Sequence, residues 1–141
     1  MKETKYIPGD LVMFKNPFEP SDTCVGIVKF LGNISDIILL CPYTNLNLEY
    51  FIKVENIQGI PITPEILEKN GWKRTQIFID DDGLEFHTYI DDERCLDLQY
   101  YPQYKKFAAF ICKQEVLSDI EYVHQLQHLL FGLGINHEME V

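Results

Sequence analysis

Two histidines four positions apart, His124 and His128, have the spacing in this sequence that most directly suggests chemistry. Side chains at positions i and i+4 of a helix share one face, so two imidazoles at this spacing can coordinate one metal ion. The hydrolytic H-E-x-x-H motif is absent, because Gln125 stands where its glutamate would be. The pattern allows a metal site, but it favours imidazoles that hydrogen-bond locally. A third metal ligand would have to come from Glu121, His137 or Glu138.

A second candidate is the acidic run Asp80-Asp81-Asp82-Gly83. Clustered carboxylates before a glycine recur in calcium loops, but here Phe78 occupies the first ligand position and no glutamate follows at the required distance. An Asp-Gly pair between alternating apolar residues is also a hairpin signal. We therefore expect a hairpin turn rather than a cation site.

Three tyrosines, Tyr100, Tyr101 and Tyr104, cluster around one proline. Tyrosines beside a turn supply a large contact area at low entropic cost and are common in protein interfaces. The alternative is that they fill the seam between two parts of the fold. We retain these three as candidate partner-binding residues, together with Tyr122 and Gln125 from the segment that carries the two histidines.

Composition excludes several classes of protein. The 141 residues carry a net charge of -10, which argues against general binding of a nucleic-acid backbone. A hydrophobic content of 46% is too high for intrinsic disorder. No G-x-S-x-G, P-loop or G-x-G-x-x-G motif occurs. The sequence favours a non-enzymatic function over an enzymatic one, and we expect no cofactor and no nucleic-acid partner.

The cysteines and the apolar stretches indicate in which cellular compartment the protein is expected. No two cysteines form a C-x-x-C pair and each lies in or beside an apolar run, which favours reduced, buried thiols over disulfides. No apolar stretch approaches the ~20 residues that cross a bilayer, and the first residues lack the apolar core of a signal peptide. We expect a cytoplasmic protein without a membrane partner. The cysteines are Cys24, Cys41, Cys95 and Cys112.

Residues 1–60 read as short strands separated by turns. Apolar and β-branched runs end at turn residues such as Asn, Gly and Pro, a spacing typical of a small curled antiparallel sheet. We expect an SH3-like small β-barrel region here. The expected strands are 11–14, 23–31, 36–41 and an alternating run over 46–53.

A short helix over 64–70 has unusually complete end signals. Thr63 is a good N-cap, and Pro64 suits the first helical position because its missing N–H needs no partner there. Gly71 is the expected left-handed residue after the helix, and Trp72 is expected to fold back onto Leu67.

Residues 61–141 are expected to form an α+β region packed as one unit with residues 1–60. Its strands are expected over 76–80, 85–90, 94–101 and 106–112. A last helix over 119–133, opened by a capping box of Ser118 and Glu121, is expected to cover this small antiparallel sheet. The predicted fold class is thus α+β: an SH3-like barrel, a short linking helix, and a sheet with a C-terminal helix.

Two segments resemble those of a known protein family. Gly59 to Lys73 is similar to the PIPLTEEILEKNGF segment of small uncharacterised proteins from gut Bacteroidetes and their phages or mobile elements. Glu121 to Leu133 resembles that family's YVHQLQ-type ending, and Gly9 to Val12 resembles its GNYV opening. The chain departs from the family at 131–135, where relatives often have Thr-Gly before an acidic end. The resemblance implies an accessory protein of mobile DNA and no catalytic residue.

We therefore expect an interaction or adaptor protein of phage or mobile-element origin that binds another, unidentified protein. One alternative is a metal-binding protein or metal-dependent enzyme using His124 and His128. Another is an acidic mimic of nucleic acid, because negative charge concentrates between Asp80 and Asp97, where Arg94 is the only basic residue. The sequence leaves the oligomeric state open.

Overall fold

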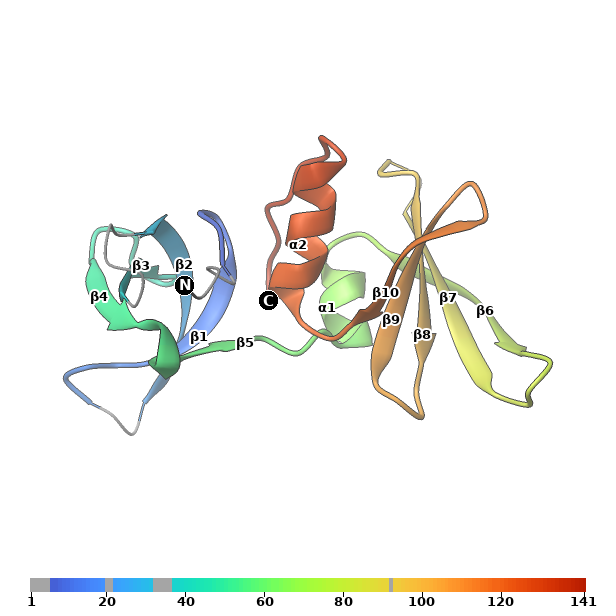
Figure 1. The fold of residues 1–141 in the computed structure, drawn as a ribbon, viewed down its shortest axis with the longest axis horizontal. Helices are drawn as coiled ribbons and strands as arrows, with labels where there is room; N and C mark the ends of the chain where they lie inside the picture. Colours follow the sequence, from blue (N-terminus) through green and yellow to red (C-terminus); the bar gives the residue numbers. More distant parts are fainter. Residues whose placement is uncertain (1–5, 20–21, 32–36, 92) are drawn as a thin grey trace. The chain divides into compact units, whose positions relative to one another are not determined.

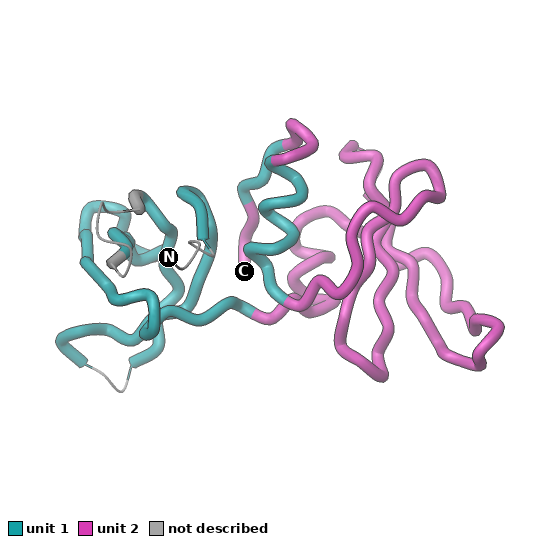
Figure 2. The backbone as a smooth tube through the Cα atoms, viewed as in Figure 1, with its two compact units in different colours: residues 1–60, 122–131, 136–138 teal, residues 61–121, 132–135, 139–141 magenta. Residues whose placement is uncertain are grey.

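The computed structural model describes residues 6–19, 22–31, 37–91 and 93–141, and the chain forms two compact units (Figure 2). The first unit contains residues 1–60, 122–131 and 136–138; the second contains 61–121, 132–135 and 139–141. Both units are mostly β, and the first includes the long C-terminal helix. The sequence predicts that this helix covers the second sheet. The structure groups residues 122–131 with the first unit.

The sheet of the first unit is a curled antiparallel half-barrel (Figure 1). Its strand order is β4-β3-β2-β1-β5, so the last strand returns to pair with the first. A short 3₁₀ turn, Val54–Asn56, precedes β5. The strands are β1 (Leu11–Lys15), β2 (Thr23–Leu31), β3 (Ile37–Pro42), β4 (Tyr50–Lys53) and β5 (Ile57–Gly59).

The core of this half-barrel depends on a glycine in the middle of β2. A Cβ at Gly26 would lie 2.7 Å from Cε1 of Phe14, so the absence of a side chain leaves the space that this ring fills. Phe14 is 1% exposed and belongs to one continuous apolar cluster. The buried members of that cluster are Tyr6, Val12, Phe14, Val28, Ile38, Leu40, Ile52 and Ile57.

The predicted strand over 46–53 is too long, since β4 begins only at Tyr50. The side-chain oxygen of Asn45 accepts the Asn47 N–H at 3.1 Å, and the Asn45 carbonyl accepts the Leu48 N–H at 3.2 Å. An asparagine side chain can hydrogen-bond nearby backbone groups, which stabilises a local turn instead of a strand. Leu46 and Leu48 consequently lie exposed in turns although they continue the alternating pattern.

The linking helix α1 (Pro64–Lys69) has the predicted ends. Thr63 accepts the N–H of Ile66 at 3.3 Å. Gly71 has a φ of +98°, and the Trp72 N–H donates to the Leu67 carbonyl at 3.0 Å, which satisfies carbonyls at the helix end. Local capping chemistry therefore sets this element, as the sequence predicts.

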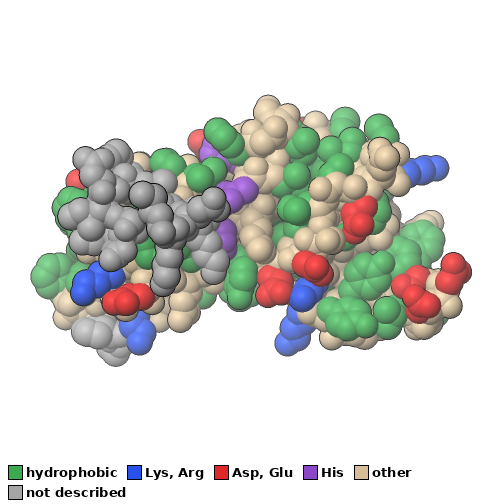
Figure 3. Space-filling model, in the orientation of Figure 1, with side chains coloured by type: hydrophobic (Ala, Val, Ile, Leu, Met, Phe, Trp, Pro, Cys, Tyr) green, Lys and Arg blue, Asp and Glu red, His purple; other side chains and the backbone are tan. Residues whose placement is uncertain are grey.

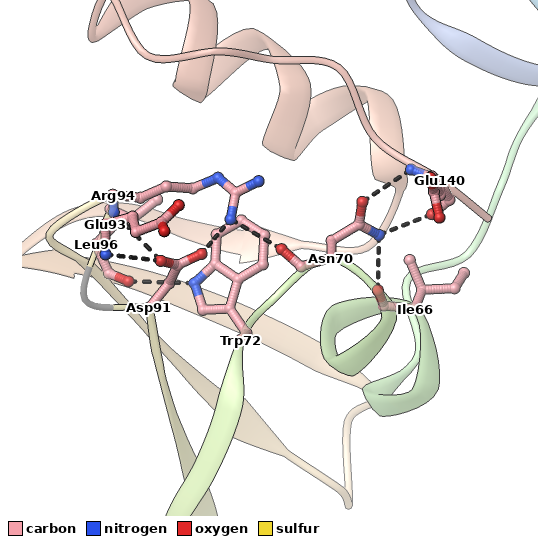
Figure 4. A network of polar contacts seen from close by, with 8 residues as sticks. All are labelled: Ile66, Asn70, Trp72, Asp91, Glu93, Arg94, Leu96 and Glu140. Atoms are coloured by element: carbon pink, nitrogen blue, oxygen red, sulfur yellow. Dashed lines mark hydrogen bonds and ion pairs between the residues drawn. The ribbon is translucent and has the colours of Figure 1, made fainter.

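A polar network beyond the end of α1 holds neighbouring segments of the second unit (Figure 4). Arg94 forms an ion pair with Asp91, donates to the Asn70 carbonyl at 2.8 Å and lies 4.4 Å from the ring centre of Trp72. The Asn70 side chain donates to the Glu140 carbonyl at 2.7 Å and accepts the Glu140 N–H at 2.8 Å. Asn70 thus pairs with the backbone of Glu140 much as a neighbouring strand would.

The second sheet is a five-stranded antiparallel meander with the order β10-β9-β8-β7-β6 (Figure 1). Because side chains alternate along each strand, one face of this sheet supplies the buried residues. These are Tyr89, Leu96, Leu98, Phe107, Ala109 and Ile120. The strands are β6 (Lys73–Ile79), β7 (Glu85–Asp91), β8 (Leu96–Tyr101), β9 (Lys106–Ile111) and β10 (Gln114–Ile120).

The helix predicted over 119–133 is shorter than expected, because its first part is the strand β10. Cys112 and Lys113 both have a positive φ, 50° and 64°, and make a two-residue hairpin turn that sends the chain back along β9. Helix α2 spans Val123–Gly132, and Gln125 accepts the Tyr122 N–H at 2.9 Å at its start. The predicted capping box of Ser118 and Glu121 is therefore wrong.

The four cysteines, all in the described part of the chain, form no disulfide. Cys41 is buried and Cys24 half-buried, but Cys95 and Cys112 are exposed, so the expectation of burial fails for these two. Both exposed cysteines have a positive φ, which places them at turns beside their apolar runs. No helix in the described residues has the length and apolar character that a membrane span requires.

Candidate functional site

The second sheet carries a row of aromatic side chains on the face opposite its buried residues. Phe78 on β6 pairs with Phe86 on β7, and their stacked rings lie 5.3 Å apart. The Phe86 ring lies 5.6 Å from that of Tyr101 on β8. Phe78 is 41% exposed, and the other two are half-buried. We call these three residues the aromatic row.

A groove of about 300 Å³ extends from Tyr101 toward β10, and we call it the tyrosine groove. The Tyr101 carbonyl accepts the N–H groups of Tyr104 and Lys105 at 3.1 and 2.9 Å, a tight turn that holds Tyr104 beside the groove while its side chain is 58% exposed. The lining includes Tyr101, Tyr104, Lys106, Ala108, Glu115 and Asp119.

The predicted tyrosine cluster is divided between the two faces of the sheet. Tyr101 and Tyr104 line the groove, whereas Tyr100 points to the other face, where it stacks on Phe107 at 4.5 Å and meets His87 edge to face at 6.1 Å. The reason is the two-residue period of β8, which turns neighbouring side chains to opposite faces. Two of the three tyrosines are thus placed to contact a partner.

Acidic side chains surround the tyrosine groove. Burial, followed by the charges of Asp80 and Glu115, raises the pKa of the Tyr101 phenol above its ordinary value. Lys106 Nζ lies 3.3 Å from a Glu121 carboxylate oxygen and 4.0 Å from one of Asp119. In the orientation of Figure 3, acidic side chains (red) lie beside hydrophobic ones (green) on the second unit.

The acidic run at 80–83 forms the predicted hairpin turn between β6 and β7. Asp80 Oδ1 accepts the N–H groups of Asp82 and Leu84, both at 2.9 Å, and Gly83 has a φ of +81°. The carboxylate therefore organises the turn itself, as Asx-type turns do. The turn places Asp80 at the end of β6, next to the aromatic row.

The histidines predicted as possible metal ligands belong to a different cluster, within the first unit. His124 and His128 meet edge to face with ring centres 5.7 Å apart. His128 Nε2 lies 2.7 Å from Asp10 Oδ2. The described residues contain no group of three or more His, Cys, Asp or Glu side chains that could hold a metal ion.

Gln127 fixes helix α2 to the start of β1. Its side-chain oxygen accepts the Leu11 N–H at 2.9 Å, and its nitrogen donates to the carbonyls of Gly9 and His137 at 3.1 and 3.0 Å. The residue is fully buried, and its bond to the Leu11 N–H is buried as well, whereas the bonds to Gly9 and His137 are partly buried. This geometry fits an anchoring role for the polar residues of α2.

Tyr122 and Gln125, both predicted as partner-binding residues, lie at the start of α2. The Tyr122 ring stacks on His124 at 5.7 Å, and both rings cover the backbone of Gly59, where a Cβ would lie 2.8 Å from Tyr122. Gln125 accepts the Tyr122 N–H. Both side chains are half-buried and take part in contacts within the first unit.

Sequence reasoning missed Asp10, which follows a glycine and looks like an ordinary turn residue. Asp10 is fully buried, and its Oδ2 accepts the Ile7 N–H at 2.8 Å besides contacting His128. Its Oδ1 has no hydrogen-bond partner among the described residues. Burial raises the pKa of this carboxyl above its usual value of 3.8, although the bonds from Ile7 and His128 act in the opposite direction.

No protein-family model, curated protein or solved structure matches this chain. Function is therefore inferred from the geometry of the described residues. Two clusters are candidates for the functional site. One is the polar cluster of α2, whose side chains hydrogen-bond within the first unit, and the other is the open aromatic face of the second sheet.

Proposed function

We propose that this protein is a non-enzymatic interaction protein that binds another protein through the aromatic row and the tyrosine groove. The observation that carries the proposal is the exposure of large apolar side chains on the second sheet. Contiguous exposed apolar surface with a polar rim is typical of protein-binding sites. The exposed aromatic residues of this face are Phe78 and Tyr104.

The two edge strands strengthen this assignment. All residues of β6, and those of β10 up to Asp119, are exposed at the two edges of the second sheet. The bulges within β10 and the charges at the ends of both strands disfavour uncontrolled strand pairing. A partner that contacts side chains of the open face fits these features.

For the first unit we propose an SH3-like small barrel. Its support is the five-strand order, in which β5 returns beside β1 after a 3₁₀ turn. We also propose a role as an accessory protein of phage or mobile-element origin, which the resemblance of residues 59–73 and 121–133 to that family supports. The proposed location in the cytoplasm has its support in the cysteine pattern and the lack of a long apolar stretch in the sequence.

Site-specific photo-crosslinking tests the proposed function. Benzoylphenylalanine replaces Phe78 or Tyr104 in the full chain expressed in its native host, and replaces the exposed Tyr43 of the first unit as a matched control. We expect the first two positions to crosslink to one and the same protein, identified by mass spectrometry, and position 43 not to. That protein, once purified, should bind the wild type and lose binding to Tyr104→Ala.

Equal crosslinking from position 43, or no specific product from positions 78 and 104, would contradict the proposal. Unchanged binding of the purified partner to Tyr104→Ala and to Phe78→Ser would contradict it as well. Because both residues are exposed, the two substitutions are expected to leave the fold intact, which circular dichroism of each variant checks.

A further inference from the structure

We infer that the tyrosine groove receives an arginine side chain from the partner. This inference rests on the proposed function, because it names the chemistry of the segment that the open face would bind. Its grounds are the shape of the groove, the aromatic walls and the surrounding charge.

The groove is large enough to receive a single long side chain. Its volume of about 300 Å³ is at the lower end of pockets that hold small ligands. Tyr101 and Tyr104 provide aromatic surface, and Ala108 is a small residue in the lining. A long side chain with an apolar stem and a polar end fits such a groove better than a bulky aromatic residue does.

The charges select a cation. Glu115 and Asp119 line the groove, and no ion pair of Glu115 occurs in the described part of the chain. Lys106 is the basic residue of the lining, and its ammonium lies closer to Glu121 than to Asp119. Asp80 adds a further negative charge near Tyr101. The lining thus has two carboxylates and one ammonium, and an incoming cation can pair with Glu115, whereas the net negative charge disfavours a phosphate or a carboxylate.

The aromatic walls select a guanidinium over an ammonium. A guanidinium is planar, stacks on aromatic rings and is more weakly hydrated than the ammonium of lysine, so it loses less on entering a half-buried site. Its fork of N–H donors can also bond a carboxylate such as that of Glu115 while the plane rests on a tyrosine. Arginine satisfies both kinds of contact at once.

The probe for this inference is an acetylated, amidated hexapeptide, Gly-Ser-Arg-Gly-Ser-Gly, titrated into the ¹⁵N-labelled full chain. We expect the amide signals of Tyr101, Tyr104 and Glu115 to shift. Replacing the arginine by lysine should weaken binding about two- to fivefold, the range expected for an exposed cation–π contact. Replacing it by citrulline, which has nearly the same shape but no charge, should abolish the shifts.

Matched variants locate the site. Tyr104→Leu and Glu115→Gln should each weaken binding about two- to fivefold. Tyr43→Leu and Glu49→Gln, which make the same changes at exposed positions of the first unit, should not. The same spectra show whether each variant retains its fold, since amide signals away from the groove should stay in place.

Equal binding of the lysine peptide, binding of the citrulline peptide, or shifts that map elsewhere would overturn the inference. Groove signals that move with protein concentration alone would identify a second copy of this chain as the occupant and would also overturn it. A partner that crosslinks at positions 78 and 104 through a segment without arginine would leave the proposed function standing while this inference fails.

Discussion

Nε2 of His128 lies 2.7 Å from Oδ2 of Asp10, a residue 118 positions earlier in the chain. The neighbouring residue Gln127 bonds the backbone of Gly9 and Leu11 on either side of that aspartate. The start of β1 and the middle of α2 are thus joined by a carboxylate–imidazole contact and an amide that bridges backbone groups. These contacts agree with the grouping of residues 122–131 with the first unit.

Replacing Asp10 should change how stability depends on pH. Between 3.8 and the raised native pKa, the native carboxyl keeps a proton that the unfolded chain has lost. The associated stabilisation is therefore complete below 3.8 and is lost as pH rises through the native pKa. The free energy of unfolding of the wild type minus that of Asp10→Asn should fall as pH rises from 3.8 through the raised native pKa, measured by urea unfolding.

Asp22→Asn is the control for this pH series, because Asp22 is an exposed aspartate of the same unit. Its pH series gives the baseline with which the Asp10→Asn series is compared. A difference for Asp10→Asn that rises with pH would show that the contact with His128 outweighs the cost of burial.

Gln127→Leu should destabilise the protein by about 2–4 kcal/mol. Leucine fills a similar volume but leaves the buried Leu11 N–H and the partly buried carbonyls of Gly9 and His137 without their bonds. Gln58→Leu, the same change at an exposed position of β5, should alter the free energy of unfolding by less than about 0.5 kcal/mol. Equal effects of the two substitutions would remove the case for anchoring by Gln127.

Gly26→Ala should cost about 1–3 kcal/mol, because the new methyl group would overlap the Phe14 ring. Phe14→Leu removes most of that ring, so the double variant should be more stable than the sum of the single effects by about 1 kcal/mol. Thermal or urea unfolding of the four proteins measures this coupling, and strict additivity would contradict the proposed packing.

Gly132→Ala, unlike Gly26→Ala, is not expected to destabilise the protein. Gly132 lies in α2, and apart from its chain neighbours and the backbone of its own helix no described atom comes within 4 Å of the place that an added methyl group would occupy. Alanine should therefore be neutral or stabilise the protein by up to about 1 kcal/mol through helix propensity, as urea unfolding would measure. A clear loss of stability here would mean that the last turn of α2 needs the flexibility of glycine.

Asn70→Asp should loosen the segment around Glu140 without disrupting α1. The aspartate oxygen can still accept the Glu140 N–H, but the donor to the Ile66 and Glu140 carbonyls becomes a second acceptor. Amide hydrogen exchange at Glu140 should quicken about tenfold, a change of about 1.4 kcal/mol in local opening. Exchange at Leu67 should change little, since the Leu67 N–H bonds the Thr63 carbonyl. Unchanged exchange at Glu140 would contradict the pairing.

The elements that the sequence predicts best are those whose signals are local. Thr63, Pro64 and Gly71 define α1 by capping chemistry, and Asp80 with Gly83 defines a hairpin turn. The prediction fails where the decisive conformation has no local signal. Nothing in the residue types at Cys112 and Lys113 indicates a hairpin with two positive φ angles, so the sequence pattern predicts the start of a helix where β10 ends.

The candidate site likewise combines features that the sequence predicts with features that only the tertiary structure sets. The sequence by itself determined that tyrosines, phenylalanines and carboxylates would be concentrated in residues 73–121, because residue types and strand alternation are local properties. The tertiary structure decided which of them share a face: the register of β6 to β8 aligns Phe78, Phe86 and Tyr101, and turns the half-buried Tyr100 to the opposite face. It also decided that Asp10 meets His128, because a contact across 118 positions is set by chain packing rather than by spacing.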